Sequence, residues 1–327
     1  MERRATPAVP AVAPPAGRAQ RLAGTRAWGR RTVRRVRCEN PVVARYGFNL
    51  TTVLRHHRHP RPLSELAREV AETLRRDGVA TVDAAALLGG SPLPDRVRAH
   101  AEAMLEGQRS GIEHRRELLA AGTVAGLPKP FLIELMGARP RLRPDDPVLE
   151  FALHDQVRGV AEAYSRCELR VQDVNLWLNL AGPLAPATSQ RWHRDLPEDY
   201  DIVKCFLYLR DVSADSGAMQ YALRTHTRQG RRMDVPQQWD GIGWRIEDTE
   251  VERRIPAEQI TLATGAAGTV VFADTRGLHK GGLARDRDRL VAQVTFASPA
   301  CFRPRLLRPA EGFSDADLPD VRLARRA

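Results

Sequence analysis

The sequence SQRWHRD, from Ser189 to Asp195, indicates both the fold and the chemistry of this chain. Polar and apolar residues alternate in it and Leu196-Pro197 follows, so we expect a short β-strand that runs into a turn. Side chains two residues apart leave a strand on the same face, which places His193 beside Asp195. Such a pair can bind a divalent metal with a third ligand, or it can be a surface histidine paired with an acid.

A second histidine and an arginine follow two apolar stretches further along the chain. Residues 268–274 have the pattern of a buried strand and lead to His279, and Arg289 then opens the run LVAQVTF. Two histidines and one carboxylate are the ligand set of non-haem Fe(II) oxygenases, and they leave three coordination positions open. A 2-oxo acid can fill two of these positions and O2 the third. The planar guanidinium of an arginine suits the distal carboxylate of 2-oxoglutarate.

With these residues in this order, the chain resembles the phytanoyl-CoA dioxygenase-like family of Fe(II)/2-oxoglutarate-dependent oxygenases. The resemblance extends over residues 62–300 and is carried by His193-Arg194-Asp195, 201–209, 216–221, Thr225-His226 and 268–296. It implies a mainly β fold with flanking helices, whose core is a double-stranded β-helix of the jelly-roll or cupin-like type.

The resemblance also implies roles for single residues. The Fe(II) ligands would be His193, Asp195 and His279. Arg289 would bind the C5 carboxylate of 2-oxoglutarate, and Phe206 would lie against this co-substrate. The family often has a lysine on the strand before His-x-Asp, which is not found here, and a small hydroxyl residue two positions after the distal histidine, where this chain has Gly281.

The positive charge of the chain is concentrated at its N-terminus. Residues 1–37 contain ten arginines and one acid and are rich in proline and alanine, whereas the other 290 residues carry a net charge of only +2. We therefore expect a disordered basic tail over 1–37 and a single oxygenase domain over 38–327. With the basicity confined to the tail, nucleic-acid binding is not expected.

Several broad classes are disfavoured by composition. No apolar run is long enough to span a membrane, so no membrane association is expected. The four cysteines show no paired spacing, which favours a reducing, cytoplasmic location without structural zinc or disulfides. The expected partner is a small-molecule substrate, and the expected oligomeric state is a monomer or a dimer.

Two helices and one strand are expected before the metal motif. Residues 62–77 and 147–165 have helical apolar spacing with capping residues at their starts. Residues 175–180 alternate asparagine or tryptophan with leucine, which predicts a strand whose leucine face meets the helices. The opposite face would look into the barrel, where Asn175, Trp177 and Asn179 become candidate contacts for co-substrate or substrate.

A polar insertion, residues 230–262, interrupts the β-core and contains Trp239 and Trp244. It is either a lid over the iron, with Trp244 near the substrate, or a surface flap whose tryptophans cover apolar core. His226, on the loop after the strand expected over 216–223, is equally consistent with a structural role and with a substrate-facing one.

The sequence thus predicts a dioxygenase that uses Fe(II), 2-oxoglutarate and O2 to oxidise a small organic metabolite. Two alternatives stay open: a non-catalytic barrel that binds a metal or ligand, and a cupin-type enzyme that needs no 2-oxoglutarate. The second alternative would leave Arg289 without a purpose. The fold does not select a substrate or choose among hydroxylation, desaturation, cyclisation and epimerisation.

Overall fold

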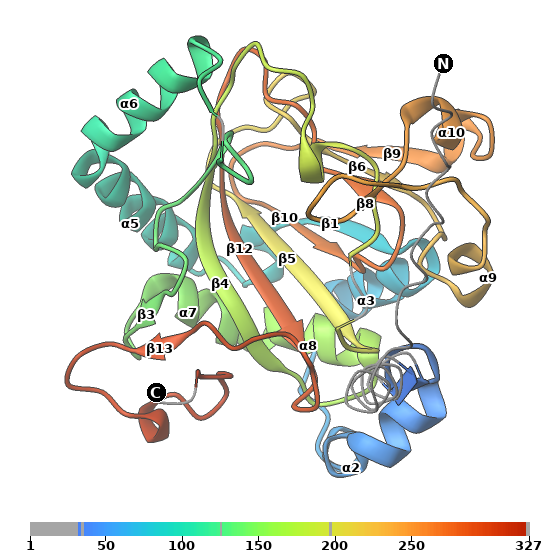
Figure 1. Ribbon diagram of the computed structural model, residues 1–327. Helices are drawn as coiled ribbons and strands as arrows, with labels where there is room; N and C mark the ends of the chain where they lie inside the picture. Colours follow the sequence, from blue (N-terminus) through green and yellow to red (C-terminus); the bar gives the residue numbers. More distant parts are fainter. Residues whose placement is uncertain (1–31, 34–35, 125, 196–197, 325–327) are drawn as a thin grey trace, which may run out of the picture.

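The computed structural model describes residues 32–33, 36–124, 126–195 and 198–324. Its centre is a six-stranded antiparallel sheet (Figure 1). Every neighbouring pair in this sheet is antiparallel. The strands lie in the order β1 (Val79–Asp83), β10 (Thr269–Ala273), β5 (Ile202–Tyr208), β12 (Arg289–Ala297), β4 (Arg170–Asn179) and β2 (Leu132–Glu134).

A smaller sheet faces this large one. It consists of β11 (His279–Lys280), β6 (Met219–Ala222) and β9 (Ile260–Ala263). Isolated bridges from His193 to His279 and from Trp192 to Ile246 extend it. Side chains of both sheets form one apolar cluster between them, with Tyr208 and Val291 from the large sheet and Met219 and Tyr221 from the small one. The predicted fold class, a jelly-roll core with flanking helices, is confirmed.

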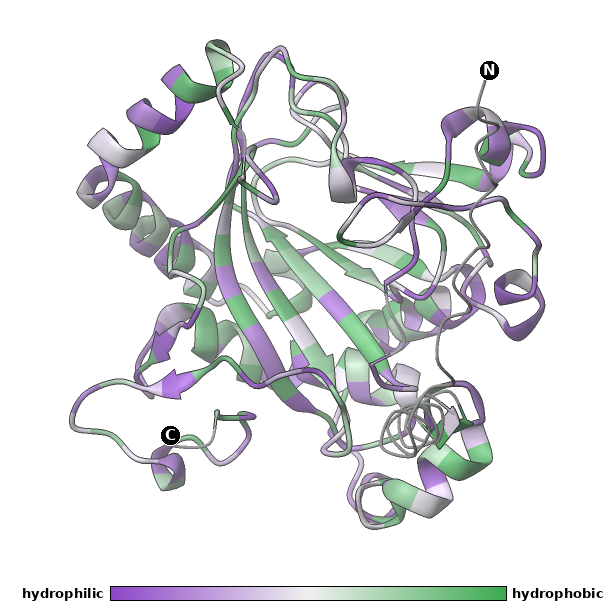
Figure 2. Ribbon diagram, viewed as in Figure 1, coloured by the Kyte–Doolittle hydropathy of each residue, from purple (hydrophilic) through white to green (hydrophobic). Residues whose placement is uncertain are grey.

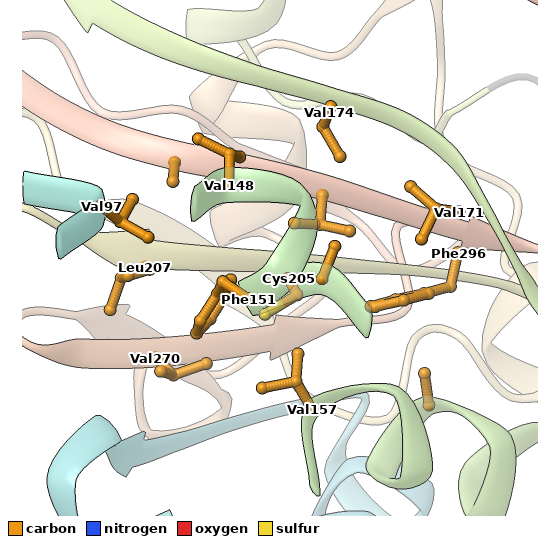
Figure 3. Packing of buried hydrophobic residues seen from close by; sticks show 14 of the residues in the cluster. Val97, Val148, Phe151, Val157, Val171, Val174, Cys205, Leu207, Val270 and Phe296 are labelled. Atoms are coloured by element: carbon orange, nitrogen blue, oxygen red, sulfur yellow. The ribbon is translucent and has the colours of Figure 1, made fainter. Parts of the chain in front are cut away.

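Helices cover the outer face of the large sheet. They are α3 (Glu65–Asp77), α5 (Leu93–Gly107), α6 (Arg109–Ala120), α7 (Pro147–Leu153) and α8 (Asp155–Ser165). Figure 3 shows Phe151 and Val157 of these helices beside Leu207 and Val270 of the strands, within the largest buried cluster of the chain. Each such side chain stabilises the fold by about 1.5–3 kcal/mol through burial.

The two faces of the large sheet differ as the alternation predicts. On β4, Leu176 and Leu178 belong to the cluster that contains the helices, whereas Trp177 and Asn179 line a cavity between the sheets. The same alternation appears as purple and green bands along the central strands in Figure 2.

Helix α3 shows why a local sequence pattern can fix an element in place. The Ser64 hydroxyl accepts a hydrogen bond from Ala67 N at 3.1 Å, which caps the first turn. Gly78 ends the helix with φ +88°, and a Cβ there would overlap the Tyr221 hydroxyl and the His226 ring. Glycine is therefore required both by the backbone conformation and by the close approach of these two side chains.

Two sequence predictions of single elements need correction. The helix expected over 147–165 is two helices, because His154 leaves the helical conformation and its ring accepts a hydrogen bond from Gln156 N at 3.3 Å as the N-cap of α8. The continuous strand expected over 189–195 is a 3-10 turn, Thr188–Gln190, followed by bridges at Trp192 and His193 only.

The remaining elements are short or lie near the termini. They are the π-helix Val43–Phe48, α2 (Leu50–Arg58), α4 (Ala84–Leu87), β3 (Arg141–Leu142), α9 (Arg228–Arg231), β7 (Gln238–Trp239), β8 (Trp244–Arg245), α10 (Asp248–Glu252), the 3-10 turns Ala257–Gln259 and Asp315–Asp317, and β13 (Arg308–Pro309). None of the described helices is long and apolar enough to cross a bilayer.

Most of the predicted basic tail, residues 1–31, lies outside the described residues. Residues 36–39 are helical, and the guanidinium of Arg37 lies 4.3 Å from the Phe48 ring and 4.1 Å from the Phe302 ring. Cys38 is buried. Arg37, at the end of the predicted tail, therefore contacts residues of the domain.

Candidate active site

The two histidines of the predicted metal site lie directly opposite each other in an antiparallel β-bridge between the segment at His193 and β11. His193 N donates to His279 O at 2.9 Å, and His279 N donates to His193 O at 3.0 Å. Asp195 N donates to Thr275 O at 2.9 Å, which continues the pairing. This register brings one side-chain ligand atom from each of His193, Asp195 and His279 within 4.8 Å of one another. Among the described residues, no other group of histidine, cysteine and acidic side chains meets in this way.

Backbone carbonyls orient both imidazole rings. His193 Nδ1 donates to Arg191 O at 2.9 Å, and His279 Nδ1 donates to Gly277 O at 3.0 Å. Each ring therefore carries its proton on Nδ1 and presents the Nε2 lone pair to the shared space, as metal-bound histidines require.

The electrostatics of the site keep the histidines neutral. Burial, with the neighbouring His279 as the second cause, lowers the pKa of His193 to about 3. Burial likewise lowers the pKa of His279, against the opposing effect of Asp195. At neutral pH both imidazoles are thus available as ligands without loss of a proton.

Among the described side chains that line the cavity, Asp195 supplies the only negative charge. Burial alone would raise its pKa, but Lys204 and the two histidines hold it well below the usual value. Lys204 Nζ lies 2.6 Å from Asp195 Oδ2, whereas Oδ1 lies 3.7 Å from His193 Nε2. One carboxylate oxygen thus faces the lysine and the other faces the histidines. The three residues fit a divalent iron, bound by two neutral nitrogens and one anionic oxygen.

Unpaired donors gather at the other end of the same cavity. Arg289 Nη1 donates to Gly217 O, but its Nε has no partner among the described residues, and neither has Asn179 Nδ2 or Trp177 Nε1. All three residues line the cavity that contains the metal ligands. Buried donors are normally satisfied, so this end fits a ligand rich in acceptors, such as the distal carboxylate of 2-oxoglutarate.

Apolar side chains form the wall between the two ends. Phe206 lines the cavity with its ring 6.1 Å from that of Trp177, and Phe131, Met219 and Val291 continue the surface. Gly281 also lines the cavity, close to Arg289 Nη2.

Three residues singled out from the sequence lie away from the cavity. Asn175 uses its amide to bind the loop after β2, accepting from Met136 N at 3.2 Å and donating to Gly137 O at 2.9 Å. His226 Nε2 bonds to Arg75 O at 3.1 Å. Trp244 lies in the β7–β8 hairpin with its ring 5.5 Å from that of Trp239, and both rings are about half exposed.

Two lysines in the cavity were missed by the sequence reasoning. Lys204 sits on β5 two residues before Phe206, so the period of two along this strand could have placed it on the inner face. Lys129 precedes β2 in a proline-flanked loop, and no local pattern marks it. In the family, the lysine often lies on the strand before His-x-Asp. Here Lys204 lies after that motif, on β5, and Lys129 lies in the loop before β2.

No protein-family model matches the chain, and no curated protein sequence matches it. Among solved structures, the chain is similar to the non-haem α-ketoglutarate-dependent carbocyclase SnoK from nogalamycin biosynthesis, at 18% identity over 81% of this chain and 93% of that one, with a TM-score of 0.49. The non-haem monooxygenase ThoJ is 17% identical over 77% and 92%, with a TM-score of 0.48. EctD from S. alaskensis, solved with 2-oxoglutarate and 5-hydroxyectoine, is 18% identical over 82% and 86%, with a TM-score of 0.45. These likenesses are distant.

Proposed function

We propose that the protein is a non-haem Fe(II)/2-oxoglutarate-dependent oxygenase of the phytanoyl-CoA dioxygenase-like type, acting on a small organic molecule. The observation that carries this proposal is the convergence of two half-sites in one cavity. His193, Asp195 and His279 form a three-ligand face at one end, and Arg289 with unpaired donors forms a carboxylate site at the other.

Each side chain of the site would have a distinct role. His193 and His279 would hold iron through Nε2, and Asp195 would hold it through Oδ1 while Oδ2 stays on Lys204. Arg289 and Asn179 would bind the distal carboxylate of the co-substrate, and Phe206 would pack against its carbon chain. Bound iron with 2-oxoglutarate supplies the activation of O2 for oxidation of a nearby C–H bond. The apolar wall of Trp177 and Phe206 keeps water from that region.

Hydroxylation with release of succinate and CO2 is the default outcome, and desaturation, cyclisation and epimerisation need the same side chains. Halogenation is disfavoured, because the carboxylate of Asp195 takes the coordination position that a halide needs. A barrel that only binds a ligand has no need for the three-ligand face, and a cupin-type enzyme without 2-oxoglutarate has no need for Arg289. The four buried cysteines, which form no disulfide with one another, favour a reducing, cytoplasmic location.

The direct test is turnover of 2-oxoglutarate. Purified protein with Fe(II) and O2 should convert 2-oxoglutarate into succinate, slowly without substrate and faster with one, while His279→Ala should not. A wild-type protein that binds Fe(II) but forms no succinate with any substrate offered would be a binding module.

A further inference from the structure

A second cavity lies apart from the candidate active site and is lined mainly by arginine. Its volume is about 330 Å³, the room of roughly eleven water molecules at about 30 Å³ each. None of the described residues that line it also lines the cavity of the metal ligands. Its six arginines come from five separate segments: Arg45 from the π-helix, Arg75 from α3, Arg166 from the position after α8, Arg228 and Arg231 from α9, and Arg276 from the segment after β10.

The charge of this arginine cavity differs from that of the rest of the domain. The 290 residues after the N-terminal tail carry a net charge of only +2. In the cavity, six arginines face one lining carboxylate, that of Asp201, and the carboxylate of Asp274 lies buried behind Arg276. With both carboxylates ionised, the cavity keeps an excess of four positive charges. A hollow with walls of one charge sign concentrates the field and attracts anions.

Three of these arginines converge on the ring of Tyr200. The guanidinium carbons of Arg276, Arg45 and Arg231 lie 5.0, 5.6 and 5.9 Å from the centre of this ring. The ring offsets part of their charge through cation–π contacts, but one ring does not neutralise three cations. Burial lowers the pKa of Arg231, and the charge of Arg276 contributes to this shift. Such a group of cations costs stability unless an anion binds among them.

Two of the six arginines have an acidic partner. Arg276 donates to both carboxylate oxygens of Asp274. Arg45 donates to Ser165 O at 2.8 Å and lies 3.5 Å from Asp201 Oδ1, while its buried Nε has no hydrogen-bond partner among the described residues. These two side chains are fixed in place by the protein and supply positive charge to the cavity.

The other four arginines have no acidic partner among the described residues. Arg75 donates to a backbone carbonyl of α8 at 2.9 Å. The side chains of Arg166, Arg228 and Arg231 form no ion pair or hydrogen bond with any residue that the structure describes. Outside the described residues the chain contains a single acid, Glu2. The chain itself therefore cannot neutralise these four cations.

Phosphate is the anion that fits these donors best. A guanidinium offers two parallel N–H donors, and a phosphate monoester offers three oxygens and nearly two negative charges. Arginines that arrive from several directions can therefore bind one phosphate together, whereas a carboxylate has two oxygens and one charge. A nucleic-acid backbone fits less well, because the positive excess is confined to one hollow of a nearly neutral domain.

We propose that the arginine cavity binds a phosphate group, carried by a soluble phosphate ester or by a lipid headgroup. Arg231, which is half-buried, is the principal ligand, and the exposed Arg166 and Arg228 complete the site from its rim. This site is additional to the proposed oxygenase function and does not depend on it, because the two cavities share no described lining residue.

Titration calorimetry with pyrophosphate and with glycerol 3-phosphate tests the site. The full, metal-free chain is used at physiological ionic strength, so that weak attraction to the N-terminal tail is screened. Arg231→Met should weaken binding about tenfold or more, because a charge-assisted pair of hydrogen bonds is lost, and Arg231→Lys should recover part of it. Arg232→Met is the matched control, since this exposed neighbour does not line the cavity, and it should bind like the wild type.

Thermal unfolding separates a ligand-binding arginine from a structural one. Pyrophosphate should raise the melting temperature of the wild type and of Arg232→Met and leave that of Arg231→Met nearly unchanged. Without ligand, Arg231→Met should melt at or above the wild-type temperature, because it removes one of several neighbouring cations. A ligand-free variant that melts clearly below the wild type would show that Arg231 stabilises the fold instead. Arg228→Met, on the exposed rim, is a second variant and should weaken binding about threefold.

Two arms of the experiment distinguish the sources of the phosphate. Glycerol 3-phosphate represents soluble esters, and phosphatidylcholine vesicles with and without phosphatidic acid represent lipid headgroups. Binding in either arm that Arg231→Met weakens and Arg232→Met does not would support the site and name its source. Equal binding by the wild type and Arg231→Met, or binding in neither arm, would overturn it. Loss of pyrophosphate binding in Arg289→Ala, with Arg231→Met unaffected, would place the anion in the active-site cavity and overturn it as well.

Discussion

Two ion pairs lie close together in this fold, Asp274–Arg276 and Asp195–Lys204, and they differ in their surroundings. Asp274 is fully buried at the end of β10, where its carboxylate accepts hydrogen bonds from Arg276 Nη2 and from the Tyr164 hydroxyl, both at 2.5 Å. Asp195, whose backbone pairs with Thr275 next to it, keeps 27% of its side chain exposed to the cavity. Both carboxylates have a cationic partner, and both have a pKa below the usual value.

The difference lies in what remains unsatisfied around each pair. Both oxygens of Asp274 are occupied, and Arg276 also donates to Tyr200 O, so this network is closed. At Asp195 one oxygen faces two neutral histidines, and across the cavity Arg289 keeps an unpaired Nε. A buried ion pair alone therefore does not identify a functional site. Polar groups that lack hydrogen-bond partners inside a cavity are the better sign of a functional site.

Asp195→Ala should have the largest effect on chemistry. The variant loses the only anionic ligand, so Fe(II) affinity should fall by more than about 100-fold and succinate formation should disappear. The melting temperature of the metal-free protein should change little, because Asp195 lies at the edge of a cavity. Fe(II) titration and thermal unfolding of the same preparations measure the two effects. A large fall in melting temperature with normal Fe(II) binding would show that Asp195 stabilises the fold, as Asp274 does, and does not bind the metal.

Asp274→Ala should give the reverse pattern. Removing one partner of a buried charged network costs about 3–5 kcal/mol of stability, while the metal ligands stay in place. Tyr164→Phe is the milder control, since it removes one hydrogen bond worth about 1 kcal/mol. Chemical denaturation measures both variants. An Asp274→Ala protein with wild-type stability would show that the network is not needed for the fold.

The ion pair of Asp274 and Arg276 should make the stability of the fold sensitive to acid. Burial alone would raise the pKa of Asp274, but Arg276 lowers it below the ordinary value of 3.8. Its contribution to stability is therefore complete above that pH and is lost as the pH falls below it. Asp274→Asn should lose less stability than the wild type between pH 5 and pH 3, as measured by denaturation midpoints. Parallel pH profiles of the two proteins would contradict this.

Arg289→Ala tests the cation in the cavity that is proposed to bind the distal carboxylate of 2-oxoglutarate. Loss of a buried carboxylate partner costs about 2–5 kcal/mol, so the apparent 2-oxoglutarate constant should rise well over tenfold. Arg289→Lys should recover only part, because an ammonium lacks the planar pair of donors. Saturation kinetics of succinate release measure both. Unchanged saturation would move the carboxylate site elsewhere, with Arg287 and Arg285 as the next candidates.

Trp244→Ala should have the smallest effect. Its ring is about half exposed and packs on Trp239, so the free energy of unfolding should change by less than about 0.5 kcal/mol. If the 230–262 insertion closes over the substrate, the variant should weaken substrate binding severalfold and leave Fe(II) and 2-oxoglutarate binding unchanged. Unchanged substrate kinetics would make the hairpin a surface flap.

Short-range patterns account for what could be predicted. The alternation on β4 and the caps of α3 follow from neighbouring residues, so the sequence was sufficient for both. The break at His154 was missed because its cap competes with a favourable helical pattern. The 189–195 segment was mistaken for a strand, because its pairing consists of two bridges to distant partners, Ile246 and His279.

The site shows the same limit. The His-x-Asp motif and the order of His279 and Arg289 are visible in the sequence, because the ligand types themselves are informative. Lys129 reaches the cavity only through the pairing of β2 with the end of β4, and Asn175 was directed away from it by the loop at Met136. Such contacts between distant segments have no local pattern to reveal them.

Anaerobic titration of the wild type with Fe(II) and 2-oxoglutarate tests the central claim most directly. Iron held by His193, Asp195 and His279, with the 2-oxo acid chelated beside Arg289, should give the weak visible charge-transfer band of such a complex. Asp195→Ala should give no band at the same concentrations. Absence of the band from the wild type, with correctly folded protein and Fe(II) in excess, would contradict the oxygenase assignment.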